Sequence, residues 1–294
     1  MLLWRIETYM NYFRQKYSKE IQVYSQGPVE SEILKVGVSL LKGSTNNVDN
    51  LKLVKGAKGR QVFSLDIDGE RYYLKRYYYR QLKKRIKNIF RAPEGVRAYD
   101  MSIKLLESGI SVANPIGVII YKKDLITKDS LFITKEFAGE DLQEYIANGS
   151  YTQELKEDII RGLAKLWATI YKNKFINGDP NLPGILVKFT EGKFKLSLVD
   201  MDNIRQLPYL PWKLVVKNLV DFNAHSYSGL DKMNNQRLSC ADRRLFFKEF
   251  IKEYGLNVNS SNTITYISKK TSDRLIKWGK RDLVAQNDDL RLFL

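Results

Sequence analysis

The stretch that decides the fold is residues 175–205, FINGDPNLPGILVKFTEGKFKLSLVDMDNIR. Its centre predicts a β-hairpin, because two short apolar runs are separated by a turn sequence in which Gly192 supplies the turn. Asp179 precedes the first predicted strand, and Asp200 and Asp202 follow the second. The hairpin is therefore expected to carry one acidic cluster on either side.

Two acidic clusters held in this way suit phosphoryl transfer from ATP. One carboxylate has to orient or deprotonate the attacking hydroxyl, and a second has to hold Mg²⁺ against the phosphates. The alternative is a hairpin whose loops carry ordinary surface acids, as any acidic turn would. The rest of the chain decides between these two interpretations.

Length and composition bound the class of protein. The 294 residues are enough for two lobes with a core, and 44% hydrophobic with 28% charged residues is typical of a soluble globular protein. No charge-free apolar run approaches the length of a membrane span. The N-terminus, MLLWRIETYM, contains Arg5 and Glu7 and no small-residue cleavage site, so no signal peptide is expected.

Cys240 and His225 are the only cysteine and histidine of the chain. A single cysteine excludes an internal disulfide and a cysteine metal cluster, and it fits a reducing cytoplasm. A single histidine leaves almost no ligands for a zinc hydrolase and few ways to build a Ser-His catalytic site. Because a lone histidine is more often structural than catalytic, His225 is assigned no role.

The chain is strongly basic, with a formal net charge of +16 and a pI of about 9.6. A field of this sign predicts anionic partners: a phospholipid surface, a phosphorylated glycolipid or nucleic acid. The densest basic block, RQLKKRIKNIFRA at 80–92, is either an anion-binding patch or a solvated helix face. Charge alone does not choose among these partners.

Residues 1–50 predict an N-terminal extension with a short amphipathic helix. Four apolar residues recur there at roughly helical spacing: Trp4, Ile6, Met10 and Phe13. Packing in the core is favoured over membrane contact for this helix. The segment GSTNNVDN at 43–50 predicts a loop.

From Leu51 the apolar residues alternate as in strands, around a hairpin turn at Asp68-Gly69. Upstream, Gly56 and Gly59 bracket the basic turn KGAKGR, where backbone amides and Arg60 could cover phosphates. The alternative is that these glycines only allow the chain to turn.

Lys75 ends the last of these strands, within YYLKRY. Kinase folds place the lysine that binds ATP phosphates on a third antiparallel strand, although an ordinary surface lysine is the alternative. Pro93 starts a predicted helix that stops at Gly109. Glu94, in its first turn, is the acid expected to pair with Lys75, ahead of Asp100 and Glu107.

The segment LFITKEFAGEDLQEYI predicts a strand, a hinge near Glu136–Gly139 and a short helix, and Glu136 is a candidate nucleotide-binding residue. A long amphipathic helix follows at about 152–174, with Ser150 and Gln153 as its expected cap. It leads directly into the acidic hairpin. Beyond the hairpin the chain is expected to be mostly helical, with amphipathic stretches near 213–223, 241–254 and 270–283.

The order of these parts is that of a two-lobed, protein-kinase-like fold. A glycine-bearing hairpin, a strand lysine, a helix with an acid, a hinge, a helix, an Asp loop and a second Asp occur in sequence. The predicted class is therefore α+β, with a small antiparallel-sheet lobe at 51–138 and a larger, mostly helical lobe at 139–294.

The chain resembles the lipopolysaccharide-core sugar kinases of the Kdo/WaaP family, from about Leu53 to about Tyr254. The resemblance is carried by YYLKRY, RAYDMSIKLLESGISVANPIGV, LFITKEFAGEDL, NGDPNLPGILV, LSLVDMDNIR and WKLVVKNLVDFN, in this order. It implies that Asp179 is the catalytic-loop aspartate, Asp200 the metal-binding aspartate and Lys75 the phosphate-binding lysine. Asp202 matches a further aspartate that commonly follows the metal ligand.

The resemblance also implies cofactors and partners. ATP and Mg²⁺ are the expected cofactors, and a Kdo or heptose hydroxyl of the lipopolysaccharide inner core is the expected acceptor. Because that acceptor is lipid-linked, the resemblance implies a cytoplasmic protein that is peripheral on the inner membrane. The basic surplus suits an anionic leaflet.

Two positions depart from the family pattern. Asn177 stands where the family usually has a histidine, and Gly184 stands where an asparagine normally binds the second metal. Asn181 is the candidate that could substitute as a ligand. Because the loss of a neutral ligand weakens a two-metal site, a catalytically impaired pseudokinase acting as a binding module is an alternative.

Two further alternatives use other classes of partner. The tyrosines interleaved with Lys and Arg at 72–79 could stack on bases, but alternating aromatics in a strand usually pack a sheet, so nucleic acid is not favoured. A kinase of an aminoglycoside, choline or protein hydroxyl would share the fold. A small-molecule kinase of this kind would favour an acidic acceptor pocket over a basic surface.

Overall fold

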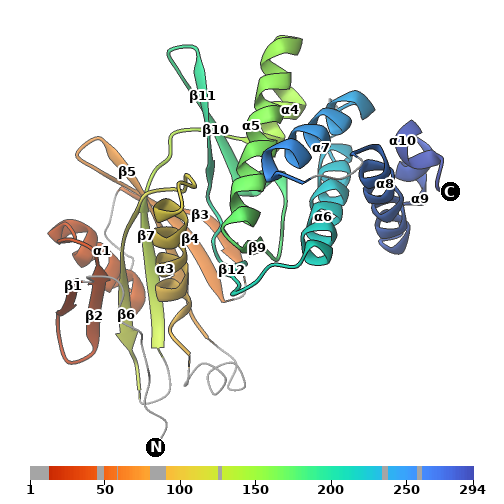
Figure 1. Ribbon diagram of the computed structural model, residues 1–294. Coiled ribbons are helices and arrows are strands. Elements are labelled where there is room, and N and C mark those ends of the chain that lie inside the picture. Colours follow the sequence, from red (N-terminus) through yellow and green to blue (C-terminus); the bar gives the residue numbers. More distant parts are fainter. Residues whose placement is uncertain are drawn as a thin grey trace, which may run out of the picture. The chain divides into compact units, whose positions relative to one another are not determined.

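The computed structural model (Figure 1) describes residues 13–44, 50–57, 59–79, 91–124, 128–233, 238–256 and 260–294. The chain forms two compact units. The first, here the sheet unit, comprises the described residues up to Lys104 together with Ala113–Glu136. The second, here the helical unit, comprises Leu105–Val112 and Phe137–Leu294. The antiparallel sheet and the helices confirm the predicted α+β class.

The sheet unit is built on a seven-stranded antiparallel sheet with the strand order β1-β2-β6-β7-β5-β4-β3. Its strands are β1 (Phe13–Lys16), β2 (Ile21–Ser25), β3 (Leu51–Ala57), β4 (Arg60–Ile67), β5 (Glu70–Tyr77), β6 (Pro115–Lys122) and β7 (Lys128–Lys135). Two helices pack on this sheet, α1 (Ser31–Lys42) and α3 (Glu94–Glu107).

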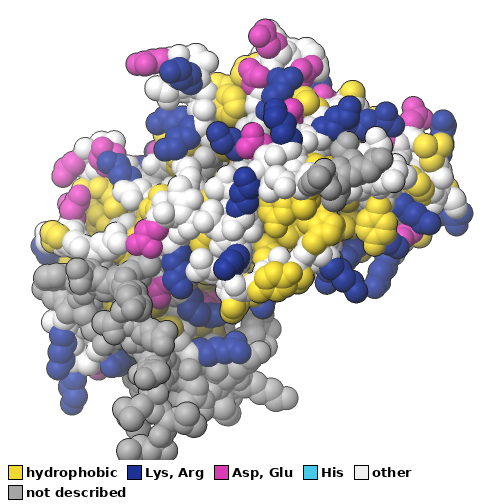
Figure 2. Space-filling view, in the orientation of Figure 1, with side chains coloured by type: hydrophobic (Ala, Val, Ile, Leu, Met, Phe, Trp, Pro, Cys, Tyr) yellow, Lys and Arg dark blue, Asp and Glu magenta, His cyan; other side chains and the backbone are white. Residues whose placement is uncertain are grey.

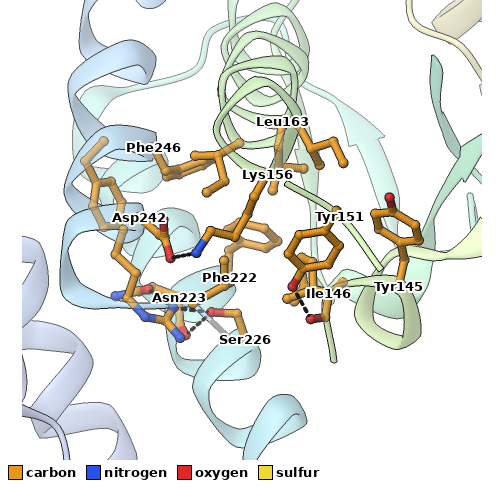
Figure 3. A pocket seen from close by; sticks show the side chains of 16 residues that line it. Tyr145, Ile146, Tyr151, Lys156, Leu163, Phe222, Asn223, Ser226, Asp242 and Phe246 are labelled. Atoms are coloured by element: carbon orange, nitrogen blue, oxygen red, sulfur yellow. Dashed lines mark hydrogen bonds and ion pairs between the residues drawn. The ribbon is translucent and has the colours of Figure 1, made fainter. Parts of the chain in front are cut away.

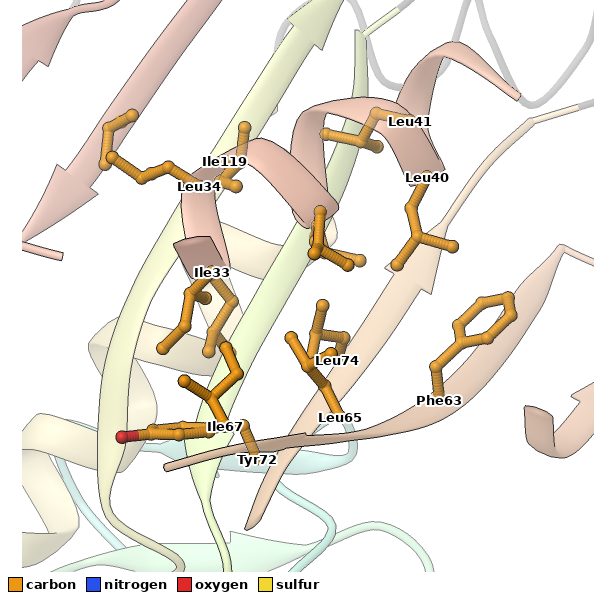
Figure 4. Packing of buried hydrophobic residues seen from close by; sticks show 14 of the residues in the cluster. Ile33, Leu34, Leu40, Leu41, Phe63, Leu65, Ile67, Tyr72, Leu74 and Ile119 are labelled. Carbon is orange, nitrogen blue, oxygen red and sulfur yellow. The ribbon is translucent and has the colours of Figure 1, made fainter. Parts of the chain in front are cut away.

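The two helices cover opposite faces of the sheet, as alternate residues of β6 show. Ile119 packs in a cluster with Ile33 and other residues of α1 (Figure 4). Val118 packs instead with Tyr99 of α3. Successive side chains of a strand point to opposite faces, so a strand that is covered on both faces has consecutive buried residues, and β6 and β7 are buried along most of their length.

Residues 13–44 belong to this sheet unit. β2 pairs with β6, with Ile21 opposite Tyr121, and α1 packs on the sheet although the sequence patterns had not identified it as a helix. Residue 50, the expected boundary, therefore lies inside the sheet unit. The amphipathic helix predicted from Trp4 to Phe13 lies outside the described residues, except for Phe13, where β1 begins.

Two hairpins turn on pairs of residues with left-handed backbone, which confirms both predicted turns. The φ angles are 49° and 78° at Asp68 and Gly69, and 51° and 74° at Glu191 and Gly192. A two-residue turn that matches the twist of the flanking strands needs positive φ at both positions, and glycine accepts it without steric cost. In the third hairpin Gly59 has a φ of 89°, whereas Gly56 lies within β3.

The helical unit combines small sheets with a group of helices. Its strands are β8 (Glu140–Asp141), β9 (Phe175–Asn177), β10 (Ile185–Thr190), β11 (Lys193–Leu198) and β12 (Ile204–Gln206), and a 3₁₀ turn spans Leu182–Gly184. Its helices are α4 (Leu142–Asn148), α5 (Gln153–Lys172), α6 (Trp212–Asp231), α7 (Cys240–Tyr254), α8 (Ser260–Lys277), α9 (Arg281–Ala285) and α10 (Asp288–Arg291). None of the helices within the described ranges has the length and apolar character needed to cross a bilayer.

Two local predictions in this unit need correction. The cap of α5 is Thr152, whose hydroxyl accepts a hydrogen bond from the Leu155 amide at 3.1 Å, and not the expected Ser150. The Thr152 backbone is extended and lies directly before the first helical residue, which is the position that a capping side chain needs. The stretch expected near 270–283 is divided at Gly279, where φ is 74°, between α8 and α9.

Aromatic side chains join the central helices of this unit. The ring of Phe222 on α6 lies 4.8 Å from Trp167 on α5 and 5.6 Å from Phe246 on α7, measured between centroids. Beside them a small cavity of about 40 Å³ holds a buried ion pair, Lys156 Nζ to Asp242 Oδ2 at 2.9 Å (Figure 3). These contacts fix α6, which also reaches the acidic loops described next.

Candidate functional site

Asp179 lies in a short loop between β9 and the 3₁₀ turn, held by three local hydrogen bonds. The Asp179 amide donates to Asn177 Oδ1 at 3.0 Å, and Asn181 Nδ2 donates to the Asp179 carbonyl at 3.1 Å. Asn181 Oδ1 in turn accepts from the Gly184 amide at 2.9 Å. The backbone is thereby ordered while the side chain of Asp179 stays 52% exposed, within reach of a substrate.

Asn177 connects this loop to two helices. Its carbonyl accepts a hydrogen bond from Asn218 Nδ2 on α6 at 2.6 Å, and Asn218 Oδ1 accepts one from the Tyr171 hydroxyl on α5 at 2.9 Å. All three residues are buried, where such bonds are costly to lose. The residue that departs from the family pattern therefore has a structural function of its own: it supports the amide of Asp179.

His225 of α6 approaches the Asp179 side chain, with Nε2 3.9 Å from Oδ1. Its ring packs against Trp278, with the centroids 4.8 Å apart. Burial lowers the pKa of His225; Asp179 and Asp221 act to raise it, and Arg274 and Lys232 act to lower it further. The imidazole is thus neutral at pH 7, and after a small movement its N–H can donate a hydrogen bond to the Asp179 carboxylate.

The second acidic cluster is brought beside the first by pairing of β9 with β12. Asn177 lies opposite Ile204, and the Gly178 amide donates to the Asn203 carbonyl at 2.8 Å. The hairpin register places Ile185 opposite Leu198, so both clusters flank the open end of the hairpin. The two clusters therefore lie at the same, open end of the hairpin, and the β9–β12 pairing joins their loops.

Asp200 and Asp202 form a turn in which the Asp202 amide donates to Asp200 Oδ1 at 3.3 Å. Two nearby carboxylates fit Mg²⁺, which usually takes one or two of them and completes its shell with water and phosphate oxygens. Among the described residues no group of three or more His, Cys, Asp or Glu side chains is placed to hold a metal. Asn181 offers its amide oxygen only in addition to the bond from Gly184.

In the sheet unit, two of the predicted nucleotide-binding residues lie near the ring of Tyr77, and a third, Glu94, pairs with one of them. Lys75 Nζ lies 5.7 Å and Arg60 Cζ 5.9 Å from the centre of its ring. Arg60 Nε is 4.0 Å from Glu94 Oε2, and Arg97 Nη2 is 3.6 Å from Glu94 Oε1. Glu94 is therefore paired with arginines, and its pairing with Lys75 stays a prediction.

Glu136 directly follows β7 and is held against β5. Its amide donates to the Arg71 carbonyl at 2.8 Å, and its carboxylate accepts from the Tyr73 hydroxyl at 3.3 Å and lies 3.6 Å from Arg71 Nη1. The side chain thus has protein partners at the end of the sheet. A nucleotide contact by Glu136 stays a prediction.

Comparison with protein families matches residues 46–246 to the lipopolysaccharide kinase (Kdo/WaaP) family. The chain belongs to this family. The matched range includes Lys75, Asp179, Asp200 and Asp202, and it ends within α7, so α8 lies outside it. Kdo/WaaP membership makes the chain a kinase, a phosphotransferase of the lipopolysaccharide core.

A solved structure supports the fold of this Kdo/WaaP family member. The chain is similar to "WaaP in complex with acyl carrier protein", with a TM-score of 0.57 and 15% sequence identity over 76% of this chain and 88% of that one. At such low identity the likeness shows the fold alone, and it confirms the predicted kinase-like fold. No curated protein matches the chain.

Two residues of the site, Asn218 and His225, were missed by sequence reasoning. They are seven positions apart on α6 and therefore share one face of the helix. That spacing was the available signal, but nothing in the sequence indicates that this face meets the Asp179 loop. A lone histidine gave no independent reason to consider it.

Proposed function

We propose that the protein transfers the γ-phosphoryl group of ATP to a Kdo or heptose hydroxyl of the lipopolysaccharide inner core. Family membership supports a kinase of a core sugar. The observation that carries the proposal is the pairing of β9 with β12, which joins the Asp179 loop to the loop of Asp200 and Asp202. This is the juxtaposition of base and metal carboxylates that kinase chemistry uses.

Asp179 is the proposed catalytic residue that orients or deprotonates the acceptor hydroxyl. Its carboxylate is half exposed, and its backbone is held on both sides by Asn177 and Asn181. His225 is the proposed positioning residue, because its neutral ring reaches the same carboxylate from a rigid helix. Most of the rate gain would come from holding the hydroxyl in line with the phosphorus.

Asp200 and Asp202, with Asn181 as a further candidate, are proposed to hold Mg²⁺. When bound, that ion would neutralise charge on the phosphates. Lys75 and Arg60 are proposed to bind the phosphates, aided by backbone amides at Gly56 and Gly59. Glu94 and Glu136 are proposed to support the nucleotide site through their contacts with the basic and aromatic side chains around them.

The proposed setting is the cytoplasmic face of the inner membrane, with the protein bound peripherally. A formal net charge of +16 supports an anionic glycolipid as acceptor and an anionic surface as its surroundings. Nucleic acid is not proposed as a partner. The second candidate function is a pseudokinase that binds without transfer, which the Gly184 departure favours because glycine offers no metal ligand.

The test is phosphate transfer from radiolabelled ATP to purified lipopolysaccharide inner core. Asp179→Asn is expected to lower the rate by roughly 10²- to 10⁴-fold, the usual contribution of a general base. Asp158→Asn is the matched control, because Asp158 is an exposed carboxylate whose one ion-pair partner among the described residues is Arg161 of the same helix. Transfer that survives in Asp179→Asn would contradict the assigned base.

A thermal-shift measurement separates the kinase from the pseudokinase. ATP is expected to raise the melting temperature further when Mg²⁺ is present, because a ligand that binds only the native state stabilises it. Asp200→Asn should lose the Mg²⁺-dependent part, whereas Asp179→Asn should keep it. No transfer and no shift in wild type would favour the pseudokinase.

A further inference from the structure

α6 and α8 enclose an open groove whose lining is both basic and apolar. The groove has a volume of about 1160 Å³, and it receives five cationic side chains and one carboxylate: Lys213, Lys217, Lys270, Arg274, Lys277 and Asp273. Figure 2 shows hydrophobic side chains gathered in the region of α6, with Lys and Arg side chains close by. This groove is distinct from the Asp179 loop and plays no part in the mechanism proposed above.

Three of the five cations have no ion-pair partner in the part of the chain that the structure describes. Arg274 Nη2 lies 2.8 Å from Asp221 Oδ1, and Lys270 Nζ lies 2.9 Å from Asp273 Oδ2. By contrast, Lys213, Lys217 and Lys277 are exposed and form no ion pair with any described residue. Lys213 and Lys217 are one helical turn apart, so their charges emerge from the same side of α6.

Apolar side chains stand among these lysines. Tyr266, on the groove face of α8, is 53% exposed, and Tyr209, which precedes α6 and lies outside the groove lining, is 75% exposed. Trp212 lines the groove at the first turn of α6, stacked on Tyr254. A surface in which aromatic rings alternate with long basic side chains matches the headgroup region of a bilayer, where the rings enter the boundary and the lysines meet lipid phosphates.

We infer that the α6–α8 groove is a docking surface for an anionic phospholipid bilayer. The inference deepens the proposed function and rests on it for the choice of occupant, because a lipid-linked acceptor would bring the protein to a membrane. The surface itself is identified from the exposed residues of the groove and not from the family match, because α8 lies outside the matched range. The assignment is carried by the exposed Tyr266 of α8 and by three lysines on two packed helices that form no ion pair within the described ranges.

The same helix links this surface to the catalytic loop. Asn218 and His225 of α6 contact the Asp179 loop, whereas Lys213 and Lys217 face the groove. A membrane held at the groove would therefore fix the orientation of Asp179 relative to the lipid headgroups. Docking would act by presenting lipid-linked acceptors to that loop, with no direct contact to the reacting atoms.

The test is sedimentation of the full-length protein with vesicles of phosphatidylcholine, with and without phosphatidylglycerol. Wild type is expected to bind only the vesicles that contain phosphatidylglycerol, and less as salt is added. The variant Lys213→Gln/Lys217→Gln/Lys277→Gln should bind roughly 100-fold more weakly, because each basic side chain near an anionic leaflet strengthens binding about fivefold. Tyr266→Ser should weaken binding further.

The matched control is Lys188→Gln/Lys193→Gln/Lys195→Gln on the β10–β11 hairpin, which removes the same charge from three other exposed lysines. This variant should bind within a few-fold of wild type. Equal losses in both triple variants would overturn the inference, since bulk charge would then explain binding. Binding of wild type to single-stranded DNA but not to vesicles would also overturn it.

The kinase assay distinguishes failure of this inference from failure of the proposed function. The groove variant should phosphorylate a soluble, lipid-free core oligosaccharide at the wild-type rate and lose activity only toward acceptor in vesicles. Transfer to the soluble acceptor without vesicle binding by wild type would remove the docking surface and leave the kinase. Vesicle binding through the groove without any phosphate transfer would support the docking surface and contradict the proposed kinase activity.

Discussion

Asn177 stands where the sequence resemblance implied a histidine, and its contacts show how the loop is built without one. Its side-chain oxygen accepts the Asp179 amide, and its carbonyl is held by Asn218. The chain's single histidine, His225, reaches Asp179 from α6 instead. The loop therefore depends on side chains of α6 that local sequence comparison does not bring together with it.

The depressed pKa of His225 predicts a pH dependence of stability. Below its ordinary pKa of 6.5 the unfolded chain binds a proton that the folded chain resists, so the free energy of unfolding falls as pH decreases through this window. His225→Gln should remove that slope, because no other histidine titrates there. Urea unfolding at a series of pH values around 6.5 measures it. An unchanged slope in the variant would refute the assignment.

Asn218→Ala should destabilise the protein by about 2–6 kcal/mol, because it leaves the Asn177 carbonyl and the Tyr171 hydroxyl without their buried partner at about 1–3 kcal/mol each. Adding Tyr171→Phe to this variant should restore part of the loss by removing one orphaned group. Chemical denaturation of the two single variants and the double variant gives the coupling energy. Strictly additive losses would contradict the linked network.

At the scale of elements, the start of α7 is held both by side-chain capping and by an ion pair to another helix. Ser239 Oγ accepts from the Asp242 amide at 3.2 Å, and Asp242 Oδ2 accepts from the Ser239 amide at 2.8 Å, which is a reciprocal capping box. The same carboxylate pairs with Lys156 of α5. One side chain thus caps α7 and joins it to α5.

Asp242→Asn should therefore cost more than the loss of an ordinary ion pair. Only 2% of the Asp242 side chain and 14% of that of Lys156 are exposed, and removing one partner of a buried pair costs about 3–5 kcal/mol. Asp158→Asn breaks an exposed pair within α5 and should cost about 0–1 kcal/mol. Urea denaturation compares them, and similar losses would contradict this role of burial.

At the scale of the whole molecule, 49 basic residues outnumber 33 acidic ones, so the excess positive charges repel one another. Such self-repulsion disfavours the compact state, and dissolved salt screens it. The melting temperature should therefore rise as sodium chloride is added from low ionic strength, and it should rise more than with an uncharged osmolyte matched for osmolality, which does not screen charge. A melting temperature that falls with salt would show that exposed ion pairs outweigh the net charge.

Much of the architecture follows from patterns between near neighbours in the sequence. The alternation around Lys75 gave β5, and the helix expected from Pro93 to Gly109 is α3, ending before Gly109 at a φ of 74°. The turns at Asp68-Gly69 and Glu191-Gly192 were predicted for the same reason. Their backbone conformation is set by the residues themselves.

Contacts across the chain were not predictable in this way. Nothing in the local patterns indicated that β1, β2 and α1 extend the main sheet, or that β9 pairs with β12. The local pattern also did not indicate that Thr152 and not Ser150 caps α5, because both residues are possible caps for the same helix end. Registers and helix faces are chosen by packing against distant partners.

The sequence by itself determined the α+β class, the acidic hairpin and the family, since these depend on residue order and local periodicity. Only the tertiary structure decided that Asn218 and His225 meet the Asp179 loop and that lysines of α6 share a groove with Tyr266 of α8. The physical reason is that a helix has several faces of similar composition. Which face meets which partner is settled when the whole core packs.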